Sequence, residues 1–316
     1  MRKTDFKDIF ADALKCNHCG LCLQNCPAYR KYKEEIASPR GRVQLANFLV
    51  KKKIDFNTEE QALLKATQSC QNCFNCTVLC PAGINPQDIN AKLKELLDIE
   101  PPKQENNILN NALLKIHLKK YFAEKDNLFL TSSCDFKQIK KTLETLKQNN
   151  FESGLYNKIL DLPNSFLAGK TDYKIPFNYK KYIFDDIENY RIAKRAVTNG
   201  KLNINEKQIL FITQTIKPHT VNLPQDALIM FSNVFASQEM AEDRQKLFAN
   251  FKNKTLNFVN NRYYFGPNFN EKTVEYLKQV PQNILITLSE RENKFLTKLA
   301  KKHNIDKKVI PIQNFI

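Results

Sequence analysis

Eight of the nine cysteines in this 316-residue chain fall in two short runs that share one spacing. In each run the cysteines are separated by two, two and three residues, and a proline follows the fourth cysteine. This pattern is typical of loops that bind [4Fe–4S] clusters, in which the fourth cysteine ligates the other cluster of the pair. The runs are Cys16, Cys19, Cys22 and Cys26 before Pro27, and Cys70, Cys73, Cys76 and Cys80 before Pro81.

The pattern predicts two [4Fe–4S] clusters whose ligands cross between the runs. Three thiolates two residues apart on a tight loop reach three irons of one cube, whereas the fourth has left that loop and points elsewhere. The proline then ends the loop, because it has no backbone N–H to donate. We therefore expect one cluster on Cys16, Cys19, Cys22 and Cys80, and the other on Cys70, Cys73, Cys76 and Cys26.

Other uses of cysteine explain this pattern less well. Structural zinc needs four ligands in paired units, which leaves the third cysteine and the proline of each run unexplained. Disulfides need an oxidising compartment, and no apolar signal segment opens the sequence. Unligated buried cysteines would not recur at one spacing. The ninth cysteine, Cys134, has no such neighbours, and we expect it to be a small buried residue at the end of a strand.

Helical patterns surround both runs. Ser38 and Pro39 combine an N-capping side chain with a proline at the first helical position, which predicts the start of a helix. Thr58 and Gln61 predict a capping box for a helix over 59–67. Because helices rather than hairpins connect the cysteine runs, residues 1–100 are predicted to form an α-helical ferredoxin domain with two [4Fe–4S] clusters.

The pattern changes after residue 100. Prolines break the preceding helix, and residues 101–126 are predicted to be a linker and a connecting helix over 108–122. From residue 127 onward, short apolar runs alternate with helical patterns, which predicts an α/β domain with a parallel sheet over 127–316. The fold class is thus α+β multidomain. The expected strands are 128–130, 182–184, 209–212, 227–231, 261–265 and 284–288, and the expected helices include 136–147, 238–251, 271–279 and 290–302.

Glycine is scarce, with 7 residues in the whole chain. The nearest pair, Gly154 and Gly169, is too widely separated for a GxGxxG turn or a GxxxxGK[ST] loop. If the protein takes part in nicotinamide, flavin or ATP chemistry, the phosphate-binding loop therefore belongs to another chain.

The formal net charge is +16, which raises the question of nucleic-acid binding. The basic residues are mainly lysines in scattered short patches, whereas a nucleic-acid groove more often shows arginine and clustered aromatic residues. Docking to an acidic protein or to an anionic membrane surface fits the charge equally well. No apolar run approaches the length of a membrane-spanning helix. Nucleic acid is therefore not the expected partner.

Three segments of the first 100 residues share more than the cysteine spacing with a known family. They read CNHCGLCLQNCPAYR from Cys16, SPRGRVQLANFL from Ser38 and CQNCFNCTVLCPAGINPQDI from Cys70. Together they resemble the iron–sulfur subunits of glycolate and lactate dehydrogenases, with related subunits in anaerobic glycerol-3-phosphate dehydrogenase and heterodisulfide reductase. The resemblance covers about a third of the chain, and the SPRGR segment makes it narrower than a likeness to ferredoxins in general.

This resemblance implies an electron-transfer subunit with no catalytic residues of its own. In that family a separate FAD-binding dehydrogenase subunit supplies the electrons, and the iron–sulfur subunit passes them singly toward a membrane-bound quinone-reducing partner. The resemblance implies no direct small-molecule substrate, and a cytoplasmic protein held at the inner face of the membrane by its partners. The family also has two cysteine-rich repeats after the cluster domain. Residues 127–316 keep only Cys134 and are interpreted as a degenerate copy of them.

Four further residues of the first domain are expected near the clusters. Gly20 lets the backbone approach the first cluster closely, and its counterpart in the second run is Phe74. Arg40 and Arg42 either donate to cluster sulfur or dock a partner's carboxylates, with solvated positions as the alternative for both. His18 is expected to be a loop residue beside the cluster, because the cysteines already complete the ligand set.

A second function class fits the same clusters. A basic iron–sulfur protein of this kind is also consistent with a binding or adaptor role, in which the clusters are structural or act as a sensor at nucleic acid or within a larger complex. The two classes differ in one measurable respect, since only an electron-transfer subunit needs its clusters to be reduced while a partner turns over its substrate.

Overall fold

The structure is a computed structural model that describes most of the chain. The described residues are 6–70, 73–99, 116, 118–133, 135–156, 162, 175–176, 178–198, 200–217, 221–231, 240–251, 257–260 and 270–316. They divide into two compact units, the first made mainly from residues up to Pro102 and the second mainly from residues that follow.

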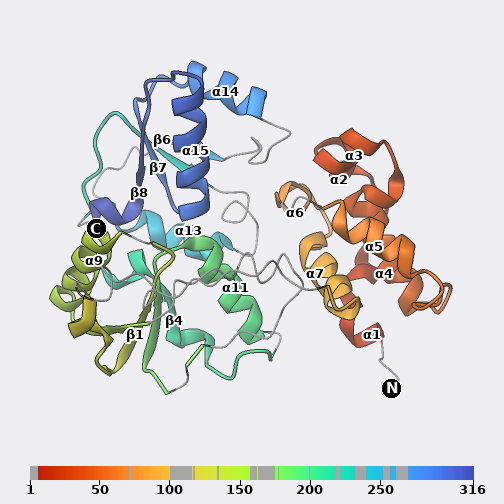
Figure 1. Ribbon diagram of the computed structural model, residues 1–316, viewed down its shortest axis with the longest axis horizontal. Helices are drawn as coiled ribbons and strands as arrows, with labels where there is room; N and C mark the ends of the chain where they lie inside the picture. The colour runs from red at the N-terminus through yellow and green to blue at the C-terminus, as the bar shows by residue number, and fades with distance from the viewer. Residues whose placement is uncertain are drawn as a thin grey trace. The chain divides into compact units, whose positions relative to one another are not determined.

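The first unit is helical, and short helices or 3-10 turns flank each cysteine run (Figure 1). Ser38 caps the longest helix of this unit, because its Oγ accepts the Gly41 N–H at 2.9 Å, and Pro39 occupies the first turn as expected. The elements are α1 (Phe6–Ile9), η1 (Ala11–Lys15), α2 (Leu21–Gln24), α3 (Pro27–Tyr32), η2 (Glu35–Ala37), α4 (Pro39–Val50), α5 (Glu60–Gln68), α6 (Asn75–Val78) and α7 (Pro86–Leu96).

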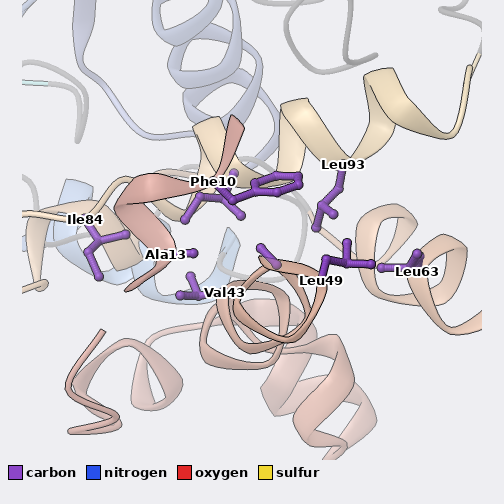
Figure 2. Packing of buried hydrophobic residues seen from close by; sticks show 9 residues of the cluster. Phe10, Ala13, Val43, Leu49, Leu63, Ile84 and Leu93 are labelled. Atoms are coloured by element: carbon purple, nitrogen blue, oxygen red, sulfur yellow. The ribbon is translucent and has the colours of Figure 1, made fainter. Parts of the chain in front are cut away.

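An apolar core holds these helices together. Figure 2 shows Phe10, Leu49 and Leu93 pointing toward one another, and all three are fully or almost fully buried. Burying side chains of this size stabilises a fold by about 1.5–3 kcal/mol each. Cys16 and Cys80, from different cysteine runs, pack against the edge of this core. The core residues are Phe10, Ala13, Val43, Ala46, Leu49, Leu63, Ile84, Ile89 and Leu93.

Gly41 fixes how η2 packs on α4. A Cβ added at this glycine would lie 2.1 Å from the backbone carbonyl oxygen of Glu35, which is far inside contact distance. Only glycine therefore lets η2 approach the start of α4 this closely. The SPRGR segment thus positions the turn that contains Glu35 against the helix that contains Arg40 and Arg42.

The second unit contains two parallel sheets with the same strand order, β2-β1-β3-β4 and β6-β5-β7-β8 (Figure 1). Parallel neighbours need crossover connections, and helices between the strands provide them. The strands are β1 (Asn127–Leu130), β2 (Ser153–Leu155), β3 (Lys181–Phe184), β4 (Ile209–Phe211), β5 (Ala227–Phe231), β6 (Asn257–Asn260), β7 (Ile284–Thr287) and β8 (Lys308–Pro311). The helical elements are η4 (Lys119–Phe122), α9 (Phe136–Gln148), α11 (Ile187–Thr198), η5 (Glu206–Gln208), η6 (Ile212–Thr215), α13 (Ala241–Phe248), α14 (Asn270–Gln279), α15 (Glu290–Lys302) and η9 (Ile312–Phe315).

Hydrogen bonds connect the carboxyl ends of the two sheets. The Ile187 N–H donates to the Leu288 carbonyl at 3.0 Å, just after β3 and β7 respectively. The Glu290 N–H donates to the Asp186 carboxylate at 2.8 Å, and the Gln313 amide donates to the Asp185 carbonyl. The two sheets therefore meet through polar groups that follow β3 in one sheet and β7 and β8 in the other.

The mixed fold class expected from the sequence is confirmed: a helical region precedes parallel-sheet α/β parts. The predicted capping box at Thr58 was wrong. The Thr58 hydroxyl donates to the Asp55 carbonyl, and α5 begins at Glu60 with no side-chain cap.

The expected strand over 261–265 and most of the expected helix over 108–122 lie outside the described residues. Among helices in the ranges given above, none is long and apolar enough to cross a membrane.

Candidate iron–sulfur site

The two cysteine runs share a local structure. In each, a residue with left-handed backbone comes before a four-residue helix that contains the third cysteine. Gly20 has a φ of 77° before α2, and Phe74 has a φ of 58° before α6. The 54-residue repeat in the sequence is therefore also a repeat of backbone conformation. A left-handed φ is easy for glycine and strained for phenylalanine, so the second run keeps this turn at a conformational cost.

The runs lie against each other in the helical unit. Helices α2 and α6 are in contact, and the Asn75 side-chain amide donates to the Asn25 carbonyl at 3.2 Å. Asn75 follows the left-handed residue of the second run, and Asn25 precedes the last cysteine of the first run. Cysteines from both runs are thus brought into one region.

One group of neighbouring thiols contains three cysteines of the first run and the last cysteine of the second. Burial raises the pKa of the Cys22 thiol to about 11, and the thiols of Cys16, Cys80 and Cys19 raise it further. An electrostatic effect of this kind requires short separations. Cys80 therefore lies beside the first run, 54 residues beyond its counterpart Cys26.

The second group shows the reciprocal arrangement. Burial raises the pKa of the Cys73 thiol to about 12, and Cys70 and Cys26 add to the effect. Burial also raises the pKa of Cys76 well above its ordinary value, with contributions from Cys73, Cys70 and Cys26. Cys26 therefore lies beside the second run, where its Sγ also accepts the Tyr29 N–H at the start of α3.

The two thiol groups differ in exposure. Cys19 in the first group is exposed, while Cys26 and Cys76 in the second group are buried. Two large apolar side chains near the first group are also solvent-accessible, Leu14 at 40% and Leu21 at 46%. The position of the repeat equivalent to Leu21 is Asn75, which is buried. A group bound by the first set of thiols would lie nearer to solvent than one bound by the second.

Arg40 holds the loop of the first run. Its guanidinium forms a two-pronged ion pair with Glu35 at 2.6 and 3.0 Å and donates to the His18 carbonyl at 3.3 Å. The same guanidinium lies 3.2 Å from the position that a Cβ on Gly20 would occupy. The Arg40 bond also holds the pKa of Glu35 below its ordinary value. Gly20, His18 and Arg40 are therefore brought together, and His18 contributes its backbone to this contact.

Arg42 is buried, with 2% of its surface exposed. Its guanidinium donates to the Ala37 carbonyl at 3.0 Å, and to the Ala66 carbonyl and the Ser69 hydroxyl at 3.4 Å each. These bonds connect α4 to the end of α5, directly before the second cysteine run. Burial raises the thiol pKa of Cys26 and of Cys76, and the positive charge of Arg42 partly opposes that rise.

Gln87 is a residue of the site that the sequence did not reveal. Its side-chain amide donates to the Cys76 sulfur at 2.9 Å, and only 2% of the residue is exposed. Lys94 on the same helix is also largely buried, and burial lowers the pKa of its ammonium group. Polar residues in a helix usually lie on its solvated face, so nothing in the sequence distinguished Gln87 and Lys94 from solvent-exposed residues of α7.

Both thiol groups fit a cluster with several metal ions. Each supplies four sulfurs, the ligand number of a [4Fe–4S] cluster. In the described ranges, no three Cys, His, Asp or Glu side chains converge closely enough to hold a single metal ion. A cube binds each thiolate at a different iron, so its four sulfurs lie further apart than those around one ion. Cys134 lies outside the described residues.

Comparisons with known proteins agree on this part of the chain. Residues 12–84 match the family model described as "4Fe-4S dicluster domain". The chain is 33% identical over 69 residues to the glycolate oxidase iron-sulfur subunit of Escherichia coli K12. The matched stretch covers 22% of this chain and 16% of that protein. The chain is 29% identical over 86 residues to the mitochondrial succinate dehydrogenase [ubiquinone] iron-sulfur subunit of Candida glabrata. That stretch covers 26% of this chain and 34% of that protein.

These matches span well under half of either relative. No solved structure matches the chain. All eight cysteines of the two runs lie inside the span that matches the dicluster family. They imply two [4Fe–4S] clusters in an electron-transfer domain that is distantly related to the iron–sulfur subunits of oxidoreductases.

Proposed function

We propose that this chain is the electron-transfer iron–sulfur subunit of a flavin-dependent dehydrogenase for a 2-hydroxy acid of the glycolate or lactate type. The observation that supports it most strongly is the crossing of the two cysteine runs, which builds two separate groups of four thiols. The partial identity to a glycolate oxidase iron-sulfur subunit favours this class of complex. An FAD-binding subunit would supply the electrons, and a membrane-bound quinone-reducing partner would accept them.

The two thiol groups are the proposed ligand sets. The first cluster is held by Cys16, Cys19, Cys22 and Cys80, and the second by Cys70, Cys73, Cys76 and Cys26. When bound, each cluster supplies a one-electron carrier. Two such carriers in one domain let the protein accept the two electrons of a reduced flavin one at a time. The cysteines fix where those electrons rest, and no residue of this chain needs to move a proton.

The exposure of the first ligand set suggests where electrons enter or leave. Cys19 is exposed, and Leu14 and Leu21 provide accessible apolar surface close by. A redox partner that covers this surface would exclude water from the first cluster and shorten the path to it. The buried second set would then exchange electrons mainly through the first cluster.

The α/β unit extends the proposal. Its two sheets share one strand order, which supports an origin by duplication and the interpretation as degenerate cysteine-rich repeats. Beyond Cys80 the sequence contains Cys134 alone, so this unit cannot supply four thiolates to a third cluster. We assign the cluster domain to residues 1–100, the connection to 101–126 and the α/β domain to 127–316, with partner docking as the function of the last.

The proposed function predicts cluster reduction during turnover by a partner. The tagged chain would be purified anaerobically with its bound proteins, and glycolate or lactate would then be added. We expect a flavin-containing subunit to co-purify, and the clusters to become reduced, seen by EPR and by bleaching of visible absorbance. A sample without added hydroxy acid is the control.

The alternative function gives the opposite result. A binding or adaptor protein with structural or sensing clusters would keep them oxidised in that experiment. It would instead bind DNA or RNA with an affinity that falls steeply as salt rises, because phosphate contacts release counterions. That pair of results would refute the electron-transfer function.

A further inference from the structure

Gln87 makes a side-chain hydrogen bond to one of the proposed cluster ligands. Its amide nitrogen lies 2.9 Å from the Cys76 sulfur, and the glutamine is almost completely buried in the first turn of α7. A donor at this position favours negative charge on the sulfur, because the N–H dipole points at it. Reduction adds one electron to a cluster, so a donor of this kind stabilises the reduced form more than the oxidised form.

The orientation of the Gln87 amide is fixed by a neighbour. The Thr77 hydroxyl lies 2.5 Å from the Gln87 carbonyl oxygen and 2.9 Å from the Asn85 side-chain oxygen. A hydroxyl that donates to the Gln87 oxygen turns the amide nitrogen toward Cys76. Thr77 directly follows Cys76 in α6, so one helix supplies both the sulfur and the residue that orients its donor.

The first cysteine run has no equivalent of this pair. In the 54-residue repeat, Cys22 corresponds to Cys76, but Leu23 replaces Thr77 and Lys33 replaces Gln87. Leucine cannot orient an amide. The hydrogen bond therefore distinguishes the surroundings of the two proposed clusters, although the ligand spacing is the same.

Charged groups near the second ligand set act in the same direction as Gln87. Arg42 is buried and donates to the Ser69 hydroxyl, directly before Cys70, so its positive charge lies close enough to favour negative charge on the sulfurs of this ligand set. Burial alone lowers the reduction potential, because it disfavours the reduced cluster, which carries more negative charge. The buried cluster would have a low reduction potential without these donors and charges.

We propose that Gln87, oriented by Thr77, raises the reduction potential of the buried cluster and so keeps it accessible to electrons from the exposed cluster. Gln87 is a positioning residue for electron transfer and does not bind iron. This inference rests on the ligand sets proposed above. The cysteine spacing is the same for both clusters, and the Gln87 hydrogen bond would give them different reduction potentials.

A redox titration followed by EPR tests the proposal. The variant Gln87→Leu keeps the size of the side chain and removes the donor. We expect about a tenfold fall in the ratio of reduced to oxidised buried cluster at a fixed potential, which is about 59 mV for a one-electron couple. The variant Gln87→Glu adds negative charge and should lower the potential further. The exposed cluster should titrate as in the wild type.

Two further variants keep the test decisive. Gln61→Leu makes the same chemical change at an exposed position on α5 and should leave both potentials unchanged. Thr77→Val keeps Gln87 but removes the hydroxyl that orients it, so it should shift the same cluster in the same direction by a smaller amount. If the Gln87→Leu variant loses the buried cluster, the reduction potential of the Thr77→Val variant decides whether the proposal holds. Wild-type potentials in the variants would overturn the proposal.

The same samples separate this inference from the proposed function. Iron content reports whether both clusters are present before any potential is measured. Two clusters with unchanged potentials in the Gln87 and Thr77 variants would refute the role of Gln87 and leave the ligand sets intact. A wild-type protein with one cluster or none would instead refute the ligand sets themselves.

Discussion

Cys26 and Cys80 close the two cysteine runs, and each lies beside the other run. Cys26 lies beside Cys70, Cys73 and Cys76, and Cys80 lies beside Cys22. This exchange makes the two halves of the repeat depend on each other. In the proposed ligand sets, each cluster takes three thiolates from one run and its fourth thiolate from the other run. The contact between α2 and α6 and the Asn75–Asn25 hydrogen bond hold the runs in the register that permits it.

The exchange of the fourth cysteines predicts that a substitution in one run abolishes the cluster held mainly by the other run. Cys80→Ala should abolish the cluster held by the first run, although Cys80 itself belongs to the second run. Its EPR spectrum should therefore match that of Cys16→Ala and differ from that of Cys70→Ala. Iron content should fall by about half, since one of two clusters is lost.

Cys134→Ala is the matched control for that comparison. Cys134 lies outside both runs, so its substitution should leave the iron content and the spectrum unchanged. If the spectrum of Cys80→Ala instead matched that of Cys70→Ala, each run would bind its own cluster and the crossed assignment would be wrong.

At the scale of single residues, the cysteines were predictable and their surroundings were not. The spacing of the runs predicts eight candidate ligands, because cluster chemistry demands one residue type at fixed intervals, and all eight lie in the span that matches the dicluster family. Gln87 gave no signal, since a polar residue in the first turn of a helix normally faces water. Its contact with Cys76 depends on how α7 packs against α6, and tertiary packing of this kind has no short-range pattern.

At the scale of elements, most strands with an uninterrupted apolar run were predictable, and strands β2 and β8 were missed. The expected strand over 182–184 corresponds to β3, and the expected helix over 290–302 coincides with α15. Strand β2 escaped prediction, because Ser153, Gly154 and Leu155 contain one apolar side chain among them. Its place in the sheet comes from pairing with β1, which the local sequence does not encode.

The ends of the strands in the α/β unit predict a pH-dependent stability. Asp185 follows β3 and is buried, and it accepts hydrogen bonds from the Thr131 hydroxyl at 2.5 Å and the Ser132 N–H at 3.0 Å. Burial raises its pKa from 3.8 to about 6, and Glu290 adds to the effect. Burial also raises the pKa of the adjacent Asp186, with Glu188 adding to the effect.

A carboxyl group whose pKa is raised by folding binds its proton more tightly in the folded state. Its stabilising contribution is complete below the unfolded pKa and is lost as pH rises through the folded pKa. For Asp185 this window runs from about 4 to about 6 and corresponds to about 3 kcal/mol in the free energy of unfolding. Asp185→Asn should therefore flatten the fall in stability over that range, as measured by urea unfolding followed by circular dichroism.

The control for the pH experiment is Asp126→Asn. Asp126 is exposed in the same unit and pairs with Lys180 at the surface, so its removal should leave the pH dependence nearly unchanged. A pH dependence that is the same in Asp185→Asn and in the wild type would show that Asp185 is ionised throughout the window.

At the scale of the whole molecule, the proposed function assigns electron storage and partner binding to different units of the chain. The helical unit contains every cysteine of the two runs, and the larger α/β unit contributes none of them. The scarcity of glycine fits this division, because phosphate-binding loops for a flavin would belong to a partner. The net charge of +16 would favour a partner with an acidic surface and would make their association sensitive to salt.

The central claim is that one chain holds two [4Fe–4S] clusters that can each take one electron. Iron and acid-labile sulfide analysis of the anaerobically purified protein, combined with EPR of the dithionite-reduced sample, tests it most directly. The account predicts about eight irons and about eight sulfides per chain, and signals from two reduced clusters. About four irons, bound zinc in place of iron, or clusters that dithionite cannot reduce would contradict it.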